Sequence, residues 1–320
     1  MELIKQKLNI GALGLVVCGL VLAGTNTIAL KFATGSMDPL VYAGIRALAI
    51  GLILFLFVGN YRKILSIKML IRVIPGVLLA VAFFAMHAIG VSQSGALKAS
   101  FLSLTIPVFV YIFAITLLHE PLIKRIFLGG IITLIGSALM IGLPVIFGNP
   151  LVISDTLLLL AYACLAASII HAKYMFRWLT TNELLSARFL ISGILLVGYI
   201  LLFQEPSTFL VGSSSAWLVL LYSIVVVGIV GNTLYYRGLT KVKAEQTAPF
   251  YFIEPTTGVL LAAMLLGETL DLIATFGVMV VLVGVAVSYP HHHYVLHNYL
   301  VPHNKRLKRI LHRLAHPIRG

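Results

Sequence analysis

The chain has 320 residues, of which 60% are hydrophobic and 10% are charged, whereas a soluble domain has roughly 45–50% apolar and about 25% charged residues. This composition excludes an ordinary water-soluble protein. The formal net charge of +13 would suggest a nucleic-acid partner in a soluble protein. In a membrane protein the position of the charges matters more than their sum, and we expect no nucleic-acid partner.

The apolar residues form blocks of about 20 residues, the length that crosses a bilayer as a helix. Polar, charged, Gly and Pro breaks separate ten such blocks, at residues 10–30, 39–58, 73–91, 98–118, 125–146, 153–172, 184–203, 215–235, 247–266 and 272–289. The first block is longer than the apolar core of a signal peptide, which has about 7–15 residues, so we interpret it as an uncleaved span. The sequence therefore predicts an all-α integral membrane protein with ten transmembrane helices.

The basic residues are distributed unequally between the two sides of these helices. Of the 23 Lys and Arg residues, Lys31 and Lys98 lie on one side and Arg46 and Arg188 lie inside spans, which leaves 19 on the side of both termini. The positive-inside rule places that side in the cytoplasm. We therefore predict a multi-pass protein of the inner (plasma) membrane with both termini cytoplasmic.

The chain contains an internal repeat of five spans. An offset of 148 residues relates the fourth and fifth spans to the ninth and tenth, through the pairs Pro107 and Pro255, Gly129 and Gly277, and Gly136 and Gly284. Earlier in each half an offset of 142 pairs Lys31 with Lys173 and Arg46 with Arg188. Five is an odd number, so the second half should cross the membrane in the opposite direction, with Glu120 cytoplasmic and Glu268 external. Inverted repeats are typical of secondary transporters.

These motifs resemble those of a known family. The proline, the Leu-Gly-Glu that follows it and the Gly-containing last span (Pro255, Gly267-Glu268, Gly277, Gly284) are similar to the signature of EamA-type transporters of the drug/metabolite transporter (DMT) superfamily. Supporting matches are Gly24-Thr25-Asn26, Lys31, Arg46, Arg188-Phe189, Asn232 to Gly238, and Glu254-Pro255. The resemblance implies a ten-helix carrier with a central cavity between two EamA-like repeats, at residues 10–146 and 153–289. Residues 1–9 and 290–320 would then be cytoplasmic segments.

Charged residues inside spans are the first candidates for function. Glu254 is the only carboxylate well inside a span, where a charge costs about 2.5–3.5 kcal/mol on insertion scales. It is either a proton or substrate site, or a structural partner of the backbone that Pro255 frees. Arg188 lies near the cytoplasmic end of its span, so we expect it to snorkel to lipid phosphate, with pairing to Glu254 as the alternative. Arg46 is deeper and is expected to be buried among helices in a structural role.

The remaining candidates are polar residues and prolines that face the expected cavity. Substrate-binding candidates besides Glu254 are Asn26, His87, Tyr162, Asn232, Tyr235 and Tyr251, although Tyr235 and Tyr236 fit an interfacial belt equally well. Pro107 and Pro255 each leave a backbone carbonyl free in mid-span and are predicted as hinges. No catalytic residue, metal site or cofactor is predicted.

The sequence favours a secondary transporter that moves a small organic metabolite, such as an amino acid-like compound, a nucleoside or a drug, by alternating access in export or exchange. The alternatives are a membrane-embedded enzyme acting on lipid-linked substrates and a non-transporting membrane subunit. Besides the substrate, the expected partners are membrane lipids. The basic, His-rich tail has apolar residues at helical spacing and is predicted to bind the anionic inner leaflet as an amphipathic helix. A homodimer is left open.

Overall fold

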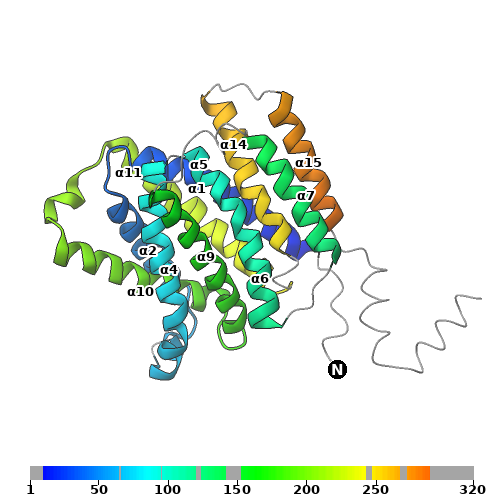
Figure 1. Cartoon of the computed structure of the whole chain (residues 1–320). Coiled ribbons are helices and arrows are strands. Elements are labelled where there is room, and N and C mark those ends of the chain that lie inside the picture. The colour runs from blue at the N-terminus through cyan, green and yellow to red at the C-terminus, as the bar shows by residue number, and fades with distance from the viewer. Residues whose placement is uncertain are drawn as a thin grey trace, which may run out of the picture.

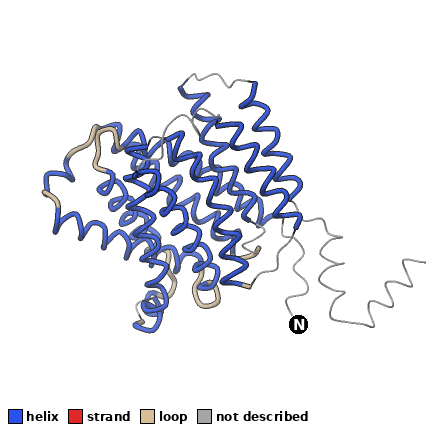
Figure 2. The backbone as a smooth tube through the Cα atoms, viewed as in Figure 1, coloured by secondary structure: helices blue, strands red, loops and turns tan. Residues whose placement is uncertain are grey.

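The computed structural model describes residues 10–64, 66–94, 96–119, 124–141, 153–242, 247–266 and 272–288. Within these ranges all regular structure is helical, as Figure 2 shows. The predicted tail helix, the His-rich segment, Glu120 and Glu268 lie outside the described residues.

The first half contains α1 (Ile10–Ala33), α2 (Pro39–Phe55), the short α3 (Tyr61–Ile64), α4 (Ile67–Ser94), a broken fourth span and α7 (Lys124–Ile141). The fourth span consists of α5 (Ala96–Leu102), the 3-10 turn η2 (Ser103–Thr105) and α6 (Ile106–Leu118). Each predicted span of this half therefore corresponds to helix, although α4 begins six residues before the predicted start at residue 73.

The second half contains α9 (Ile153–Met175), α10 (Thr181–Phe203), the 3-10 turn η3 (Pro206–Leu210), two broken spans and α15 (Leu272–Ser288). The eighth span consists of α11 (Ser214–Tyr222), a π-helical segment η4 (Ser223–Gly231) and α12 (Asn232–Leu239); the ninth consists of the 3-10 turn η5 (Ala248–Phe252) and α14 (Ile253–Leu266). Among the described residues, five helical segments are long and apolar enough to cross a membrane, and shorter apolar helices accompany them. The ten-helix membrane fold predicted from the sequence is confirmed.

The breaks in the fourth and ninth spans fall directly before the two predicted prolines. Pro107 lies in the first turn of α6, where its missing N–H costs no intrahelical bond, and Pro255 is the third residue of α14. The π-helical segment of the eighth span was not predicted, because no proline or charge marks it in the sequence.

The start of α10 is set by a capping box. The Thr180 hydroxyl accepts the backbone N–H of Glu183, and the Glu183 carboxylate accepts the backbone N–H of Thr180 at 2.9 Å. Lys63 of α3 also bonds this carboxylate, at 3.2 Å. These contacts begin α10 three residues before the predicted start of the seventh span.

The second and seventh spans show the repeat directly in their packing. A Cβ atom at Gly51 of α2 would lie 2.2 Å from the backbone nitrogen of Leu190, and one at Gly193 of α10 would lie 2.3 Å from the backbone nitrogen of Leu48. Both pairs of equivalent residues, 51 with 193 and 48 with 190, are 142 apart. The two helices are antiparallel, and each contact is the two-fold image of the other.

The fifth and tenth spans repeat this arrangement with the other offset. A Cβ at Gly136 of α7 would lie 2.6 Å from the nitrogen of Val281, and one at Gly284 of α15 would lie 2.5 Å from the nitrogen of Thr133. Here equivalent residues are 148 apart. Figure 1 shows α7 and α15 side by side at one edge of the bundle. Antiparallel packing of equivalent helices establishes that the repeat is inverted.

The other helices form two groups, and the two-fold relation of the repeat superimposes each group on the other. α1 packs against α12 and α14, and its counterpart α9 packs against α4 and α6. We call the first group, with η4 and η5, the α1 body, and the second group the α9 body. The pair of α2 and α10 contacts both bodies. Large apolar side chains are exposed on the outer faces of α7, α10 and α15, where lipid would cover them.

Candidate functional site

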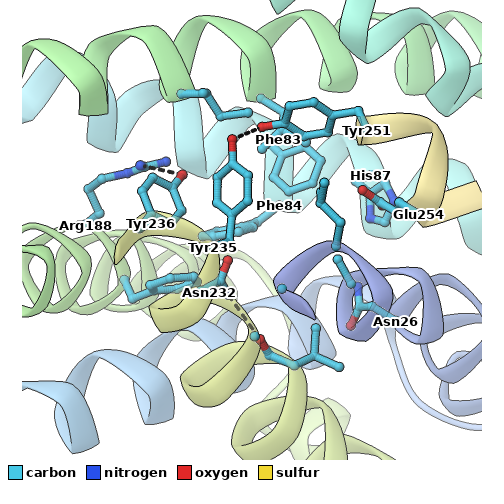
Figure 3. Close-up of a pocket in the computed structure, with 18 of the residues that line it drawn as sticks. Asn26, Phe83, Phe84, His87, Arg188, Asn232, Tyr235, Tyr236, Tyr251 and Glu254 are labelled. Atoms are coloured by element: carbon cyan, nitrogen blue, oxygen red, sulfur yellow. Dashed lines mark hydrogen bonds between the residues drawn. The ribbon is translucent and has the colours of Figure 1, made fainter. Parts of the chain in front are cut away.

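A cavity of about 110 Å³ lies between the α1 body and the α9 body, beside the crossing of α2 and α10. A water molecule needs roughly 10–15 Å³ of such space, so the cavity has room for roughly seven to eleven water-sized groups. The polar lining residues are Asn26, Arg46, His87, Arg188, Asn232, Tyr235, Tyr236, Tyr251 and Glu254. Apolar and aromatic side chains from both halves complete the wall, as Figure 3 shows in part.

The break in the ninth span presents Glu254 to the cavity. Its carboxylate has no hydrogen bond or ion pair with any residue that the structure describes, and it lines the cavity from the first turn of α14. Gly24 of α1 packs against the backbone of Glu254, because a Cβ at residue 24 would lie 2.4 Å from the carbonyl oxygen of Glu254. The close approach of α1 to the break therefore requires glycine at residue 24.

Three tyrosines, Tyr235, Tyr236 and Tyr251, contribute hydroxyl groups to the wall of the cavity. The hydroxyls of Tyr235 and Tyr251 are hydrogen-bonded to each other, and the rings of Tyr235 and Tyr236 meet edge to face at 5.0 Å. All three side chains are buried in the bundle, so the alternative that Tyr235 and Tyr236 belong to an interfacial belt is wrong.

Arg188 is also buried, with 6% of its surface exposed. Its Nη1 donates to the Tyr236 hydroxyl at 3.0 Å and its Nη2 donates to Ser168, while Nε has no acceptor among the described residues. The prediction that Arg188 snorkels to lipid is therefore wrong, because two neighbouring helices supply hydroxyl acceptors inside the bundle. It forms no ion pair with Glu254.

Arg46 occupies the equivalent position in the first half. It is buried as expected, and its Nε donates to the Ser223 hydroxyl at 2.7 Å, which in turn donates to the Asn26 side-chain oxygen at 2.7 Å. Asn26 and Ser168 are 142 residues apart, so each arginine is linked to the same repeat position. Figure 3 shows Arg188 with Tyr236 at one side of the cavity and Asn26 at the other.

Two lysines join the bodies at opposite ends of the cavity. Lys31 of α1 donates to the carbonyl of Ser92, in the last turn of α4, at 2.7 Å. Its counterpart Lys173 of α9 donates to the carbonyl of Leu239, at the end of α12, at 2.6 Å, and to that of Val242. Each lysine therefore bridges the α1 body and the α9 body, and we call these contacts the Lys31 clamp and the Lys173 clamp.

The structure brings most of the predicted residues together. Asn26, His87, Asn232, Tyr235, Tyr251 and Glu254 line the cavity, as do both arginines, which were predicted to be structural. Tyr162 lies behind this wall, where its hydroxyl donates to the Ala99 carbonyl at 2.8 Å and its ring meets that of His87. Pro107 and Pro255 are outside the lining.

Sequence reasoning missed the aromatic side of the cavity, formed by Phe83, Phe84 and Phe189. Phe84 stacks on Phe189 with ring centroids 5.3 Å apart. The signal that could have found Phe84 is the repeat itself. Gly90 of α4 packs against Leu158 as Gly238 of α12 packs against Val16, so the offset between the third and eighth spans is 148 and pairs Phe84 with Asn232.

A helical bundle with an inverted repeat and a cavity shared by both halves defines a polytopic membrane protein of the transporter class. Residues 10–142 and 152–289 each match the EamA-like transporter family. The chain belongs to this family, and the resemblance seen in the sequence is confirmed.

Comparison with solved structures agrees on the fold. A structure titled "Crystal structure of protein" is similar to this chain with a TM-score of 0.69 and 14% sequence identity, over 86% of this chain and 97% of the other. At this identity the likeness shows the fold alone. No curated protein matches the chain in sequence.

Proposed function

We propose that this protein is a secondary transporter that moves a small organic metabolite across the inner membrane by alternating access, in export or exchange. The observation that carries the proposal is the position of the cavity between two bodies that are images of each other. A rocking motion of one such body against the other opens a central site to each side in turn.

The two clamps give this motion a physical basis. Breaking the Lys31 clamp would separate the bodies at one end of the cavity, and breaking the Lys173 clamp would separate them at the other. With both clamps formed, as here, the bodies are joined at both ends. In the proposed cycle only one clamp is broken at a time, so the two ends are never open together.

Glu254 is proposed to couple substrate movement to protons. It is the one carboxylate among the described lining residues, and it has no fixed partner there. Glu254→Gln should leave insertion and folding unchanged but weaken transport or abolish its pH dependence. The matched control is Glu205→Gln, which alters an exposed carboxylate outside the cavity. Unchanged kinetics of the Glu254 variant across pH would reduce the residue to a structural role.

Flux into proteoliposomes tests the proposal itself. A panel of labelled amino acids, nucleosides, organic acids and cationic drugs should include at least one compound that enters vesicles containing the protein faster than protein-free vesicles. If correctly inserted, monodisperse protein moves none of these classes, the transporter assignment for this chain fails.

The clamps can be tested separately once a substrate is known. After replacement of Cys18 and Cys164, cysteine pairs at positions 31 and 92 or at 173 and 242 would be bridged by a short bifunctional thiol reagent. Bridging either pair should stop the flux that the same cysteine pair, which already lacks its clamp lysine, shows without reagent. Full flux through protein bridged at either end would contradict rocking between these bodies.

A further inference from the structure

We infer that the cavity selects small organic anions, and that Arg46 and Arg188 form a two-fold pair of binding groups for a substrate carboxylate. This inference rests on the proposed transport function and specifies its substrate class. The first observation is the charge of the cavity. The described lining residues include two guanidinium groups and one carboxylate, and arginine does not lose its proton in proteins. The net charge is therefore at least +1 whatever the protonation state of Glu254 and His87.

The hydrogen bonds of the two arginines leave donors unused. A guanidinium carries five N–H donors, and the described bonds use one at Arg46 and two at Arg188. The acceptors Ser223, Ser168 and Tyr236 are neutral hydroxyls, so they satisfy single donors without balancing the charge. The remaining donors suit a planar carboxylate, which arginine binds through two parallel N–H···O bonds.

The placement of the arginines also fits transport from either side. Leu48 meets Gly193 and Gly51 meets Leu190 where α2 and α10 cross. Arg46 and Arg188 lie on opposite sides of that crossing, about seven residues or about 10 Å apart along the helix axis. Whichever end of the cavity opens, an entering anion meets one guanidinium and leaves past the other.

The surrounding wall limits the size and nature of the rest of the substrate. A volume of about 110 Å³ suits a small metabolite, and Phe83, Phe84, Phe189 and the tyrosines provide flat apolar surfaces beside the charged groups. The substrate class is therefore a small carboxylate with an apolar or aromatic body.

Benzoate, benzamide and benzamidine test this class, because the three have nearly the same shape and differ in charge. Purified protein in a neutral detergent would be melted with each compound, and the shift in Tm would be fitted to an apparent Kd. Benzoate should stabilise the protein, whereas benzamide and benzamidine should have little effect. Equal or greater stabilisation by either of the latter would overturn the inference.

Variants then assign the effect to the arginines. Arg46→Gln and Arg188→Gln should each weaken benzoate binding about tenfold or more, the usual effect of losing a charge-assisted hydrogen bond. Arg46→Lys and Arg188→Lys should restore part of the affinity for benzoate. They also replace the Gln variants in this test if a Gln variant misfolds. The control is Arg125→Gln, which removes a bond to the Val287 carbonyl outside the cavity and should bind benzoate like the wild type. Unchanged affinity in both Gln variants would refute the role of the pair.

Binding in detergent and flux in vesicles separate the two proposals. Anion binding without flux of any compound would leave the anion site standing and remove the transport function. Flux of neutral or cationic compounds without any preference for anions would support transport and overturn the substrate class.

Discussion

The close packing of α2 and α10 predicts how much stability the protein loses when a single methyl group is added at Gly51. Gly51→Ala places a Cβ 2.2 Å from the backbone nitrogen of Leu190, whereas ordinary van der Waals contact begins at 3.4 Å. The helices must therefore separate locally by about 1.2 Å, because the neighbour is backbone and cannot rotate away. Overpacking of this kind costs about 1–3 kcal/mol, and the rigid neighbour places Gly51→Ala toward the upper end.

A second glycine on the partner helix isolates this cost. Alanine is favoured over glycine in a helix by about 0.5–1 kcal/mol, which partly masks the clash in Gly51→Ala. Gly198 of α10 has no atom within 4 Å of its would-be Cβ, so Gly198→Ala receives the same gain without a clash. The difference in unfolding free energy between the two variants is therefore the overpacking cost alone.

Reversible unfolding in mixed micelles, followed by circular dichroism, measures these free energies. Gly193→Ala should resemble Gly51→Ala, because it makes the two-fold-related contact with Leu48. The double variant should lose less than the sum of the two, since one separation of the helices relieves both clashes. A Gly51→Ala protein as stable as Gly198→Ala would refute the packing of these helices, and full additivity would show that no single separation of the helices relieves both clashes.

Further predictions concern the start of α10 and the orientation of the chain. Thr180→Ala removes the capping hydroxyl and should cost about 0.5–2 kcal/mol, whereas Lys63→Gln removes only a partly exposed ion pair with Glu183 and should cost less than about 1 kcal/mol. The same unfolding titration ranks the two, and a larger loss at Lys63 would contradict this account. In a cysteine-free background, cysteine at Ser66 should react with an impermeant thiol reagent only from the cytoplasm and cysteine at Ser207 only from outside. Labelling from one common side would overturn the proposed topology.

The helices and their repeat could be predicted from the sequence because each depends on local or periodic signals. Apolar length and charge alternation defined ten spans. The offset of 142 relates the contact of Gly51 with Leu190 to that of Gly193 with Leu48, and the offset of 148 relates the contact of Gly136 with Val281 to that of Gly284 with Thr133. The π-helical segment η4 escaped prediction because a wider helical turn needs no particular residue type.

The environment of the candidate residues could not be predicted in the same way. Arg188 was expected to reach lipid because only its distance from the end of its span was known. Its burial depends on Ser168 and Tyr236, which come from α9 and α12 and supply acceptors that no spacing within α10 reveals. Tyr162 was predicted to line the cavity but lies behind it, because its hydroxyl bonds a backbone carbonyl of α5.

Symmetry and its exceptions have different consequences for the proposed cycle. Two identical halves would give the inward-open and outward-open states equal free energy in a symmetric membrane, so the two-fold scaffold accounts for opening to both sides but for no preferred direction. The arginines and clamp lysines follow the two-fold. Glu254 does not, because its equivalent is Ile106, which is buried in the core outside the cavity lining. η4 is a second exception, opposite the continuous helix α4. Of these two exceptions, Glu254 is the one that can also carry a proton, so we expect it to contribute to any directional preference.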